Sequence, residues 1–413
     1  MQVFISDCKY FLADMANQRF VPCSRICYNV MRSCKVIIFK GRNNLIVATA
    51  KPKSKPKLLE LDVVRAIAIL AVLIIHSTSD ATVELPIGSG SQAMYLALNK
   101  LSNFAVPVFI IVSGIVLFYK YQGESFGGKQ VLQFYVKRVK HVLFPYVLWS
   151  LFYYLYNQWI FDRENLHMDW SRFADLLPWA EASYHLYFMV IIVQFYLLFP
   201  LMMWLCRFAW FRRSLIWIGL VIQAVFYSYN HWVEPINHMP SLCVNYFSMF
   251  TLGGWIGLHY ETFAAWLRRH AAWVLPAAVV IGCSFLGLFM LEGRTSIVLD
   301  GAWYHVLFFV YAALAGLSLI RLGQLLIRFA MPAARALMAL GAVSFGIYLI
   351  HPAVLTYYRT HFPNESGAIG QYHLYTFTAF ALSLIIPWIL TYAYGLAVRL
   401  LRRPKPKSSA QGA

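Results

Sequence analysis

The sequence predicts an all-α polytopic membrane protein with about ten transmembrane helices and both termini in the cytoplasm. Of its 413 residues, 60% are hydrophobic and only 13% are charged, whereas soluble domains carry roughly 25% charged residues. The apolar residues are concentrated in runs of roughly 18 to 25 residues, the length that spans the hydrocarbon core of a bilayer. Basic and acidic residues also alternate between the segments that connect these runs, which indicates an orientation.

Ten apolar segments are predicted to cross the membrane. Aromatic residues are dense near many of their ends, as in YHLYF at 184–188 and TFTAF at 376–380, which is typical of the membrane–water interface. The predicted spans cover residues 61–79, 101–119, 142–161, 186–206, 214–229, 240–259, 271–290, 303–320, 335–358 and 374–398.

The charges of the connecting segments predict the topology. One alternate set, listed below, holds 30 Lys and Arg against 6 acidic residues, and the other holds 5 against 11. Because Lys and Arg accumulate in cytoplasmic loops, the basic set and both termini are predicted to be cytoplasmic. The net charge of +18 then reflects membrane orientation, and we expect no nucleic-acid partner. The basic set comprises the N-terminal tail with the start of the first span, residues 120–141, 207–213, 261–270 and 321–335, and the C-terminal tail.

Three regions are predicted along the chain. Residues 1–57 form a basic cytoplasmic tail that we expect to be disordered, because it ends in the Pro/Lys spacer KPKSKPK at 51–57. Residues 58–400 form the transmembrane domain, and residues 401–413 form a second basic tail. No signal peptide is predicted. The seven cysteines lie in the cytoplasmic tail or in spans, so we expect free thiols.

The first span carries two ionisable residues at the ends of an aliphatic run. In LDVVRAIAILAVLIIHSTSD, residues 61–80, only Ala, Ile, Leu and Val separate Arg65 from His76. Eleven helical steps are 1100°, or 20° past three turns, so both side chains lie on one face about 16 Å apart along the axis. Asp80 follows His76 by four residues and could orient its ring. The alternatives are that Arg65 pairs with Asp62 or reaches to the interface, and that Asp80 is an ordinary loop acid.

This spacing suits acyl transfer across or within the membrane. A cation near the cytoplasmic face can hold a donor that bears phosphates. An imidazole, whose ordinary pKa is close to neutral pH, can accept the proton of an alcohol acceptor. The stretch from Arg65 to His76 therefore predicts an axis from donor to acceptor.

Five stretches resemble acyltransferase family 3, and they occur in the order typical of that family. LDVVRAIAILAVLIIH is similar to its first-helix signature, in which ten residues separate Arg from His. VPVFIIVSGIVLFYK (106–120), FYVKRVKHVLFPYVLW (134–149), SYHLYFM (183–189) and SFGIYLIHP (344–352) resemble its later elements. The resemblance covers about residues 60–400 and agrees with the family's ten-helix core.

The resemblance implies a function and several site residues. Members of the family transfer acyl groups, usually acetyl from cytoplasmic acetyl-CoA, to hydroxyls of surface or exported carbohydrates and lipids. His76 would be the catalytic imidazole with Asp80 beside it, and Arg65, Lys137 and Arg138 would bind the acyl-CoA. No extracellular hydrolase-like domain is recognised, so the chain resembles the stand-alone type. The alternative is an exopolysaccharide exporter or flippase, an activity also attributed to some relatives.

Three further residues are candidates for binding the acceptor. His185 lies at the outer entry of the fourth span, and Tyr348 and His351 lie one turn apart late in the ninth. Each has a structural alternative, as an interface residue or a packed helix residue. Likewise, Lys137 and Arg138 could be an ordinary basic flank of a span. Ser113 and Gly114 are predicted to be structural, at a close helix contact.

The expected partners are membrane lipid, an acyl-CoA co-substrate and a carbohydrate or glycolipid acceptor. The expected location is the bacterial cytoplasmic membrane. We expect no bound metal ion and no resident cofactor. His231 and His238, which flank Glu234, could read as a metal site, but their spacing forces no shared face.

Overall fold

The computed structural model describes residues 3–5, 36–39, 45–48, 55–123, 127–295, 297–364 and 368–401. The chain divides into two compact units, residues 1–57 and residues 58–413, and each is described by itself.

The N-terminal unit contains three short strands: β1 (Val3–Ile5), β2 (Val36–Phe39) and β3 (Leu45–Ala48). They form an antiparallel sheet in the order β1-β2-β3, with Ile37 opposite Phe4 on one side and Val47 on the other. The runs VIIF and LIVA are rich in the β-branched residues that favour strands, a signal that the all-α prediction passed over. The other residues before 55 lie outside the described residues, so disorder of the tail stays a prediction.

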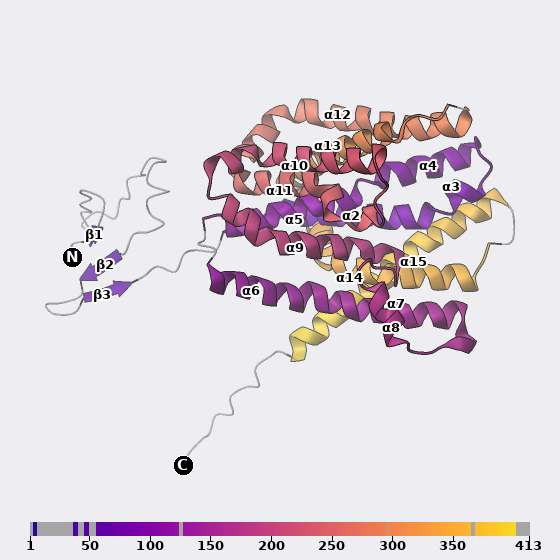
Figure 1. Ribbon diagram of the computed structural model, residues 1–413, viewed down its shortest axis with the longest axis horizontal. Helices are drawn as coiled ribbons and strands as arrows, with labels where there is room; N and C mark the ends of the chain where they lie inside the picture. The colour runs from indigo at the N-terminus through magenta and orange to yellow at the C-terminus, as the bar shows by residue number, and fades with distance from the viewer. Residues whose placement is uncertain are drawn as a thin grey trace, which may run out of the picture. The chain divides into compact units, whose positions relative to one another are not determined.

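The regular elements in the described part of the membrane unit are all helices, joined by turns and loops (Figure 1). Its α-helices are α2 (Glu60–Thr78), α3 (Ala81–Glu84), α4 (Gly90–Ser102), α5 (Ala105–Tyr121), α6 (Gly128–Arg138), α7 (Phe144–Phe161), α8 (Trp170–Leu176), α9 (Tyr187–Leu205), α10 (Ala209–Trp232), α11 (Phe247–Leu258), α12 (Tyr260–Arg294), α13 (Gly301–Phe329), α14 (Met331–His361) and α15 (Ile369–Leu401). Shorter turns link them: the π-helical η2 (Val139–Leu143) and the 3₁₀ turns η3 (Arg163–Asn165), η4 (Tyr184–Leu186), η5 (Met239–Ser241) and η6 (Cys243–Tyr246).

Every predicted span falls on a helix, which confirms the all-α polytopic architecture of the membrane unit. The described residues contain eight helical segments that are long and apolar enough to cross a membrane. Helices α7 and α11, at the third and sixth predicted spans, are not among the eight. Helix α11 has only 12 residues, because the chain enters it through 3₁₀ turns. Several helices extend beyond the predicted limits; α12, for example, has 35 residues.

Small residues bring the helices close together. A Cβ atom at Gly253 of α11 would overlap the backbone carbonyl of Ile111 in α5, and one at Gly114 of α5 would lie 2.5 Å from the carbonyl oxygen of Phe250. The predicted close contact at Gly114 is therefore present, whereas the Ser113 hydroxyl donates within its own helix to the Phe109 carbonyl, 2.8 Å away. Such small-residue contacts are typical of membrane helix packing.

Hydrogen bonds at two places join connecting segments of like charge class. At one end, the hydroxyl of Tyr260, the residue just before the basic segment 261–270, donates to the Glu60 carboxylate at the start of α2. At the other end, the Tyr372 hydroxyl donates to the Glu84 carboxylate over 2.7 Å, which joins two segments of the acidic set. Helix α2 begins and α15 ends toward the same end of the membrane unit (Figure 1). This arrangement agrees with the alternation of charge; that the basic end is cytoplasmic stays a prediction.

Candidate functional site

Three histidines from distant parts of the chain meet near the acidic end of the helices. His76 lies in the last turn of α2, His185 in η4 and His351 in α14. The ring centroids of His76 and His351 are 5.3 Å apart, and those of His185 and His351 are 5.7 Å apart. His185 and His351 are fully buried, whereas His76 keeps part of its surface exposed. The structure thus unites the predicted catalytic histidine with two of the predicted acceptor-binding residues.

The hydrogen bonds of His351 determine which ring nitrogen carries its proton. Its Nδ1 lies 3.1 Å from the carbonyl oxygen of Ile347, and a carbonyl can only accept, so Nδ1 carries the hydrogen. In the neutral ring, Nε2 then has a free lone pair, and it is buried without a hydrogen-bond partner among the described residues. In His185, Nδ1 lies 3.0 Å from the Ser183 hydroxyl, and Nε2 is buried without a hydrogen-bond partner among the described residues. Such groups are costly to bury unless something binds them.

Tyrosines enclose the histidines. Tyr184 packs against His76 and Tyr153 against His185, each with ring centroids 4.9 Å apart. Tyr348 lies beside His351 as predicted, at 6.3 Å between centroids, but its hydroxyl donates to the backbone carbonyl of His185. Tyr348 therefore joins α14 to η4, and its hydroxyl is occupied in the structure.

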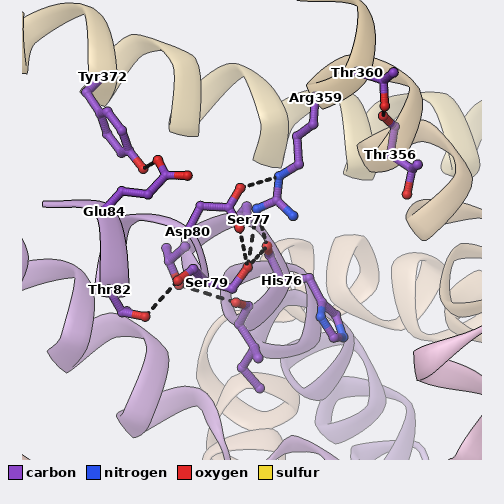
Figure 2. Close-up of polar contacts among 12 residues, drawn as sticks. His76, Ser77, Ser79, Asp80, Thr82, Glu84, Thr356, Arg359, Thr360 and Tyr372 are labelled. Carbon is purple, nitrogen blue, oxygen red and sulfur yellow. Dashed lines mark hydrogen bonds and ion pairs between the residues drawn. The ribbon is translucent and has the colours of Figure 1, made fainter. Parts of the chain in front are cut away.

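Asp80 does not orient the His76 ring as predicted. Its carboxylate forms an ion pair with Arg359 of α14, with Oδ2 and Nε 2.8 Å apart, and no hydrogen bond joins it to the imidazole among the described contacts. Figure 2 shows the His76 ring directed away from this ion pair. The physical reason is the competing cation: Ser79 and Asp80 keep α-helical backbone angles, but the Asp80 carboxylate pairs with Arg359 of the neighbouring helix. Burial raises the pKa of the Asp80 carboxyl, and the Arg359 cation opposes that rise.

Arg359 is the residue that the sequence analysis missed. Besides its ion pair with Asp80, its Nη2 donates to the backbone carbonyl of His76 over 2.9 Å and lies 3.3 Å from the Ser79 hydroxyl (Figure 2). The sequence did contain an indication that Arg359 has a specific partner. It is one of only five basic residues in the connecting segments where acidic residues predominate. A cation that departs from the charge pattern of its own side of the membrane calls for a partner.

The opposite end of the helices carries the predicted donor-binding cations. Arg65 forms an ion pair with Asp62, with Nη1 and Oδ1 2.8 Å apart, and its side chain is 30% exposed. Arg138 lies over the rings of Phe134 and Tyr196, 4.9 and 4.5 Å from their centroids, and its buried Nε has no hydrogen-bond partner among the described residues. Lys137 is exposed to solvent.

The face of α2 between these two regions is closed. Ile69 and Val72 lie on the same helix face as Arg65 and His76, and they are 0% and 3% exposed. They pack in a core that also contains Leu186 of η4. A molecule that reached from Arg65 to His76 along this face would therefore have to displace packed side chains.

The pattern of a family described as an acyltransferase domain matches residues 58–392. This match covers most of the chain and includes every site residue described above. The chain belongs to acyltransferase family 3. With its apolar helices, this acyltransferase family 3 member is a multi-pass protein of the cell membrane.

Curated relatives of this family member carry names that refer to a polysaccharide. One is the probable poly-beta-1,6-N-acetyl-D-glucosamine export protein of Staphylococcus aureus (strain MSSA476), which is 25% identical over 309 residues, or 72% of this chain and 82% of the relative. Its namesake from Staphylococcus epidermidis is 23% identical over 318 residues, or 73% of this chain and 82% of the relative. No solved structure matches the chain significantly.

Proposed function

We propose that this protein is an integral-membrane O-acyltransferase that moves an acetyl group from cytoplasmic acetyl-CoA to a hydroxyl of a surface or exported carbohydrate. The observation that supports this most strongly is the meeting of His76 with two buried histidines from η4 and α14. The guanidinium groups of Arg65 and Arg138 lie at the opposite end of the helices. Membership of the acyltransferase family supports the reaction class.

His76 acts in this proposal as the general base. The imidazole accepts the proton of the acceptor hydroxyl while that oxygen attacks the thioester carbonyl. A carbon–oxygen bond forms and the carbon–sulfur bond breaks. The proton then passes from the imidazolium to the leaving thiolate, which departs as CoA with a free thiol. In this proposal, Nε2 of His351, which is buried without a partner among the described residues, accepts a hydrogen bond from a second sugar hydroxyl.

The opposite end holds the donor. Guanidinium groups bind phosphates through several donors in a fixed plane, and Arg138 has a buried Nε that lacks a partner among the described residues. Arg65 is partly exposed, so a bound phosphate can reach it. Lys137 adds an exposed positive charge. Because Ile69 and Val72 close the face of α2, productive binding of the donor requires these side chains to move.

The names of the relatives favour a second candidate, the export of a polysaccharide. The staphylococcal proteins are named as probable exporters of poly-beta-1,6-N-acetyl-D-glucosamine. In that case the histidines and tyrosines near the acidic end would contact a passing polymer, and no acetyl group would be transferred. The two candidates differ in their requirement for acetyl-CoA.

Labelled acetate separates the two candidates in cells that make the surface polysaccharide. We would measure acetyl label in the polymer and the amount of polymer exported, for the wild type and for His76→Ala. His270→Ala is a matched control, because His270 is an exposed histidine of α12. The proposal predicts that His76→Ala loses the label while the control keeps it. Unchanged labelling in His76→Ala would reject the transferase role, and a loss of export without a change in labelling would favour the exporter.

A further inference from the structure

The last turn of α2 needs hydrogen-bond donors from outside the helix. The last four carbonyls of an α-helix have no partner within it, and α2 ends at Thr78, two residues after His76. The His76 carbonyl is satisfied by the Arg359 guanidinium, 2.9 Å away, and by the Ser79 hydroxyl, 3.0 Å away. Since Arg359 belongs to α14, the backbone of His76 is tied to another helix.

The guanidinium group that makes this contact is itself held in place. Its Nε faces the Asp80 carboxylate at 2.8 Å, and the Ser79 hydroxyl lies 3.1 Å from the same carboxylate. Figure 2 shows these contacts as one connected network beside His76. The planar guanidinium can serve a carboxylate and a carbonyl at once in a fixed geometry. A lysine ammonium lacks this rigid fork.

Helix α14 therefore contacts His76 in two places. His351 lies against the imidazole with 5.3 Å between ring centroids, and Arg359, eight residues later on α14, holds the backbone carbonyl. Tyr184 packs on the ring as well, at 4.9 Å between centroids. The position of the His76 imidazole relative to Nε2 of His351 thus depends on the contact of Arg359 with the end of α2.

We propose that Arg359 is a positioning residue for His76, and that Asp80 supports the histidine by orienting Arg359. This inference rests on the proposed acyl transfer for its catalytic consequence, but the positioning itself does not depend on any activity. It also gives Asp80 an indirect role, in place of direct contact with the imidazole.

The kinetic test compares Arg359→Gln, Arg359→Lys and the wild type in acetyl transfer from acetyl-CoA. Misplacing a catalytic group by about 1 Å can cost ~100-fold in rate, so we expect kcat of Arg359→Gln to fall by about 10- to 100-fold. The KM for acetyl-CoA should stay the same, because Arg359 lies far from the donor-binding cations. Arg359→Lys should recover part of the rate, since the charge remains. An unchanged kcat in Arg359→Gln would overturn the catalytic part of the proposal.

A double-mutant cycle distinguishes the indirect role of Asp80 from a direct one. If Asp80 acts only through Arg359, Asp80→Asn lowers kcat in the wild type and adds little to Arg359→Gln, because coupled residues are not additive. A further fall of the same size in the Arg359→Gln background would show that Asp80 acts on His76 independently, and would overturn this part of the proposal.

A measurement without turnover separates positioning from the proposed function. Diethyl pyrocarbonate modifies imidazoles, and mass spectrometry of the peptide that contains His76 gives the rate at this residue. Arg359→Gln should be modified several-fold faster, because the last turn of α2 is released. Tyr372→Phe is the matched control: it removes one hydrogen bond to Glu84 in the same region without touching α2, and should leave the rate unchanged. Equal rates in Arg359→Gln and the wild type would overturn the positioning, even if the wild type transferred no acetyl group.

Discussion

The two ends of the membrane unit are built on different principles. Near the acidic end, His185 and His351 are fully buried and each has a ring nitrogen without a partner among the described residues. At the basic end, Arg65 and Arg138 are charged, and Arg65 is partly open to solvent. One helix, α2, carries a residue of each region, with Arg65 and His76 about 16 Å apart along its axis. The difference suggests a division of labour, with ionic binding at one end and proton transfer at the other.

The distance between these two regions also explains why α14 contacts α2 near both of its ends. Its start is approached by α14 at Gly341, where a Cβ would overlap the backbone carbonyl of Asp62. Its end is held by Arg359, also of α14. A helix that relates two distant regions must keep both its angle and its rotation. Contacts at each end with the same neighbouring helix provide that constraint.

Removing the base should have the largest effect and tests the acidic end alone. His76→Gln should lower kcat by about 100- to 10,000-fold, the usual contribution of general acid–base catalysis, with the KM for acetyl-CoA unchanged. A turnover assay on purified protein in lipid nanodiscs measures both constants. The thermal transition should move little, because the His76 ring makes no hydrogen bond among the described contacts and loses only its packing on Tyr184 and His351. A large rise in the KM for acetyl-CoA would contradict the division between the two ends.

Removing a cation proposed to bind the donor should have the next largest effect, and this effect should be on the KM for acetyl-CoA. Arg65→Gln should raise the KM for acetyl-CoA by about tenfold or more, since a hydrogen bond to a charged group contributes roughly 1.5–3 kcal/mol, and kcat should change little. Arg269→Gln is a control at the same end, because Arg269 is exposed on α12. If both variants raise the KM equally, the effect belongs to the general field of the basic end and not to Arg65.

The first span could be predicted well from the sequence, and the network around it only in part. The aliphatic run, the shared face of Arg65 and His76 and the alternating charges were sufficient to identify α2 and the residues at its ends. The partner of Asp80 was not predictable in the same way. Arg359 lies 279 residues later in the chain, and only tertiary packing of α14 on α2 brings it to Asp80. Local helical spacing had favoured His76 as the partner.

The contact between His185 and His351 likewise could not be predicted from local sequence patterns. Both were candidates as single residues near span ends, but neither spacing nor charge relates η4 to α14. The strands of the N-terminal unit lie outside the transmembrane domain; there, overall composition outweighed the local β-branched runs VIIF and LIVA.

Removing the free lone pair of His351 should have a smaller effect, which should appear in kcat/KM for the acceptor. His351→Phe keeps a planar ring but no acceptor nitrogen. A neutral hydrogen bond contributes about 0.5–1.5 kcal/mol, so kcat/KM for the acceptor should fall about 3- to 10-fold, with the KM for acetyl-CoA unchanged. A competition assay between the two substrates measures this. No change in acceptor kinetics would restrict His351 to a packing role.

Changing the packing of the helices between the two ends should have the smallest effect on the transfer reaction. Gly253→Ala would place a Cβ against the Ile111 carbonyl and should destabilise the protein by about 1–3 kcal/mol, as overpacking does. Gly287→Ala of α12 is the control, since no atom lies near its Cβ position. Thermal unfolding in detergent compares them. A Gly253→Ala variant as stable as the control would contradict the close packing of α5 on α11.

Sealed membrane vesicles test the central claim, that a donor bound at the cytoplasmic side is used by chemistry that depends on His76. Labelled acetyl-CoA is added outside inside-out and right-side-out vesicles from cells that make the wild type or His76→Gln, and label in carbohydrate is counted. The account predicts label in wild-type inside-out vesicles, label in right-side-out vesicles only after permeabilisation, and none with His76→Gln. Equal labelling of intact right-side-out vesicles, or full labelling with His76→Gln, would contradict it.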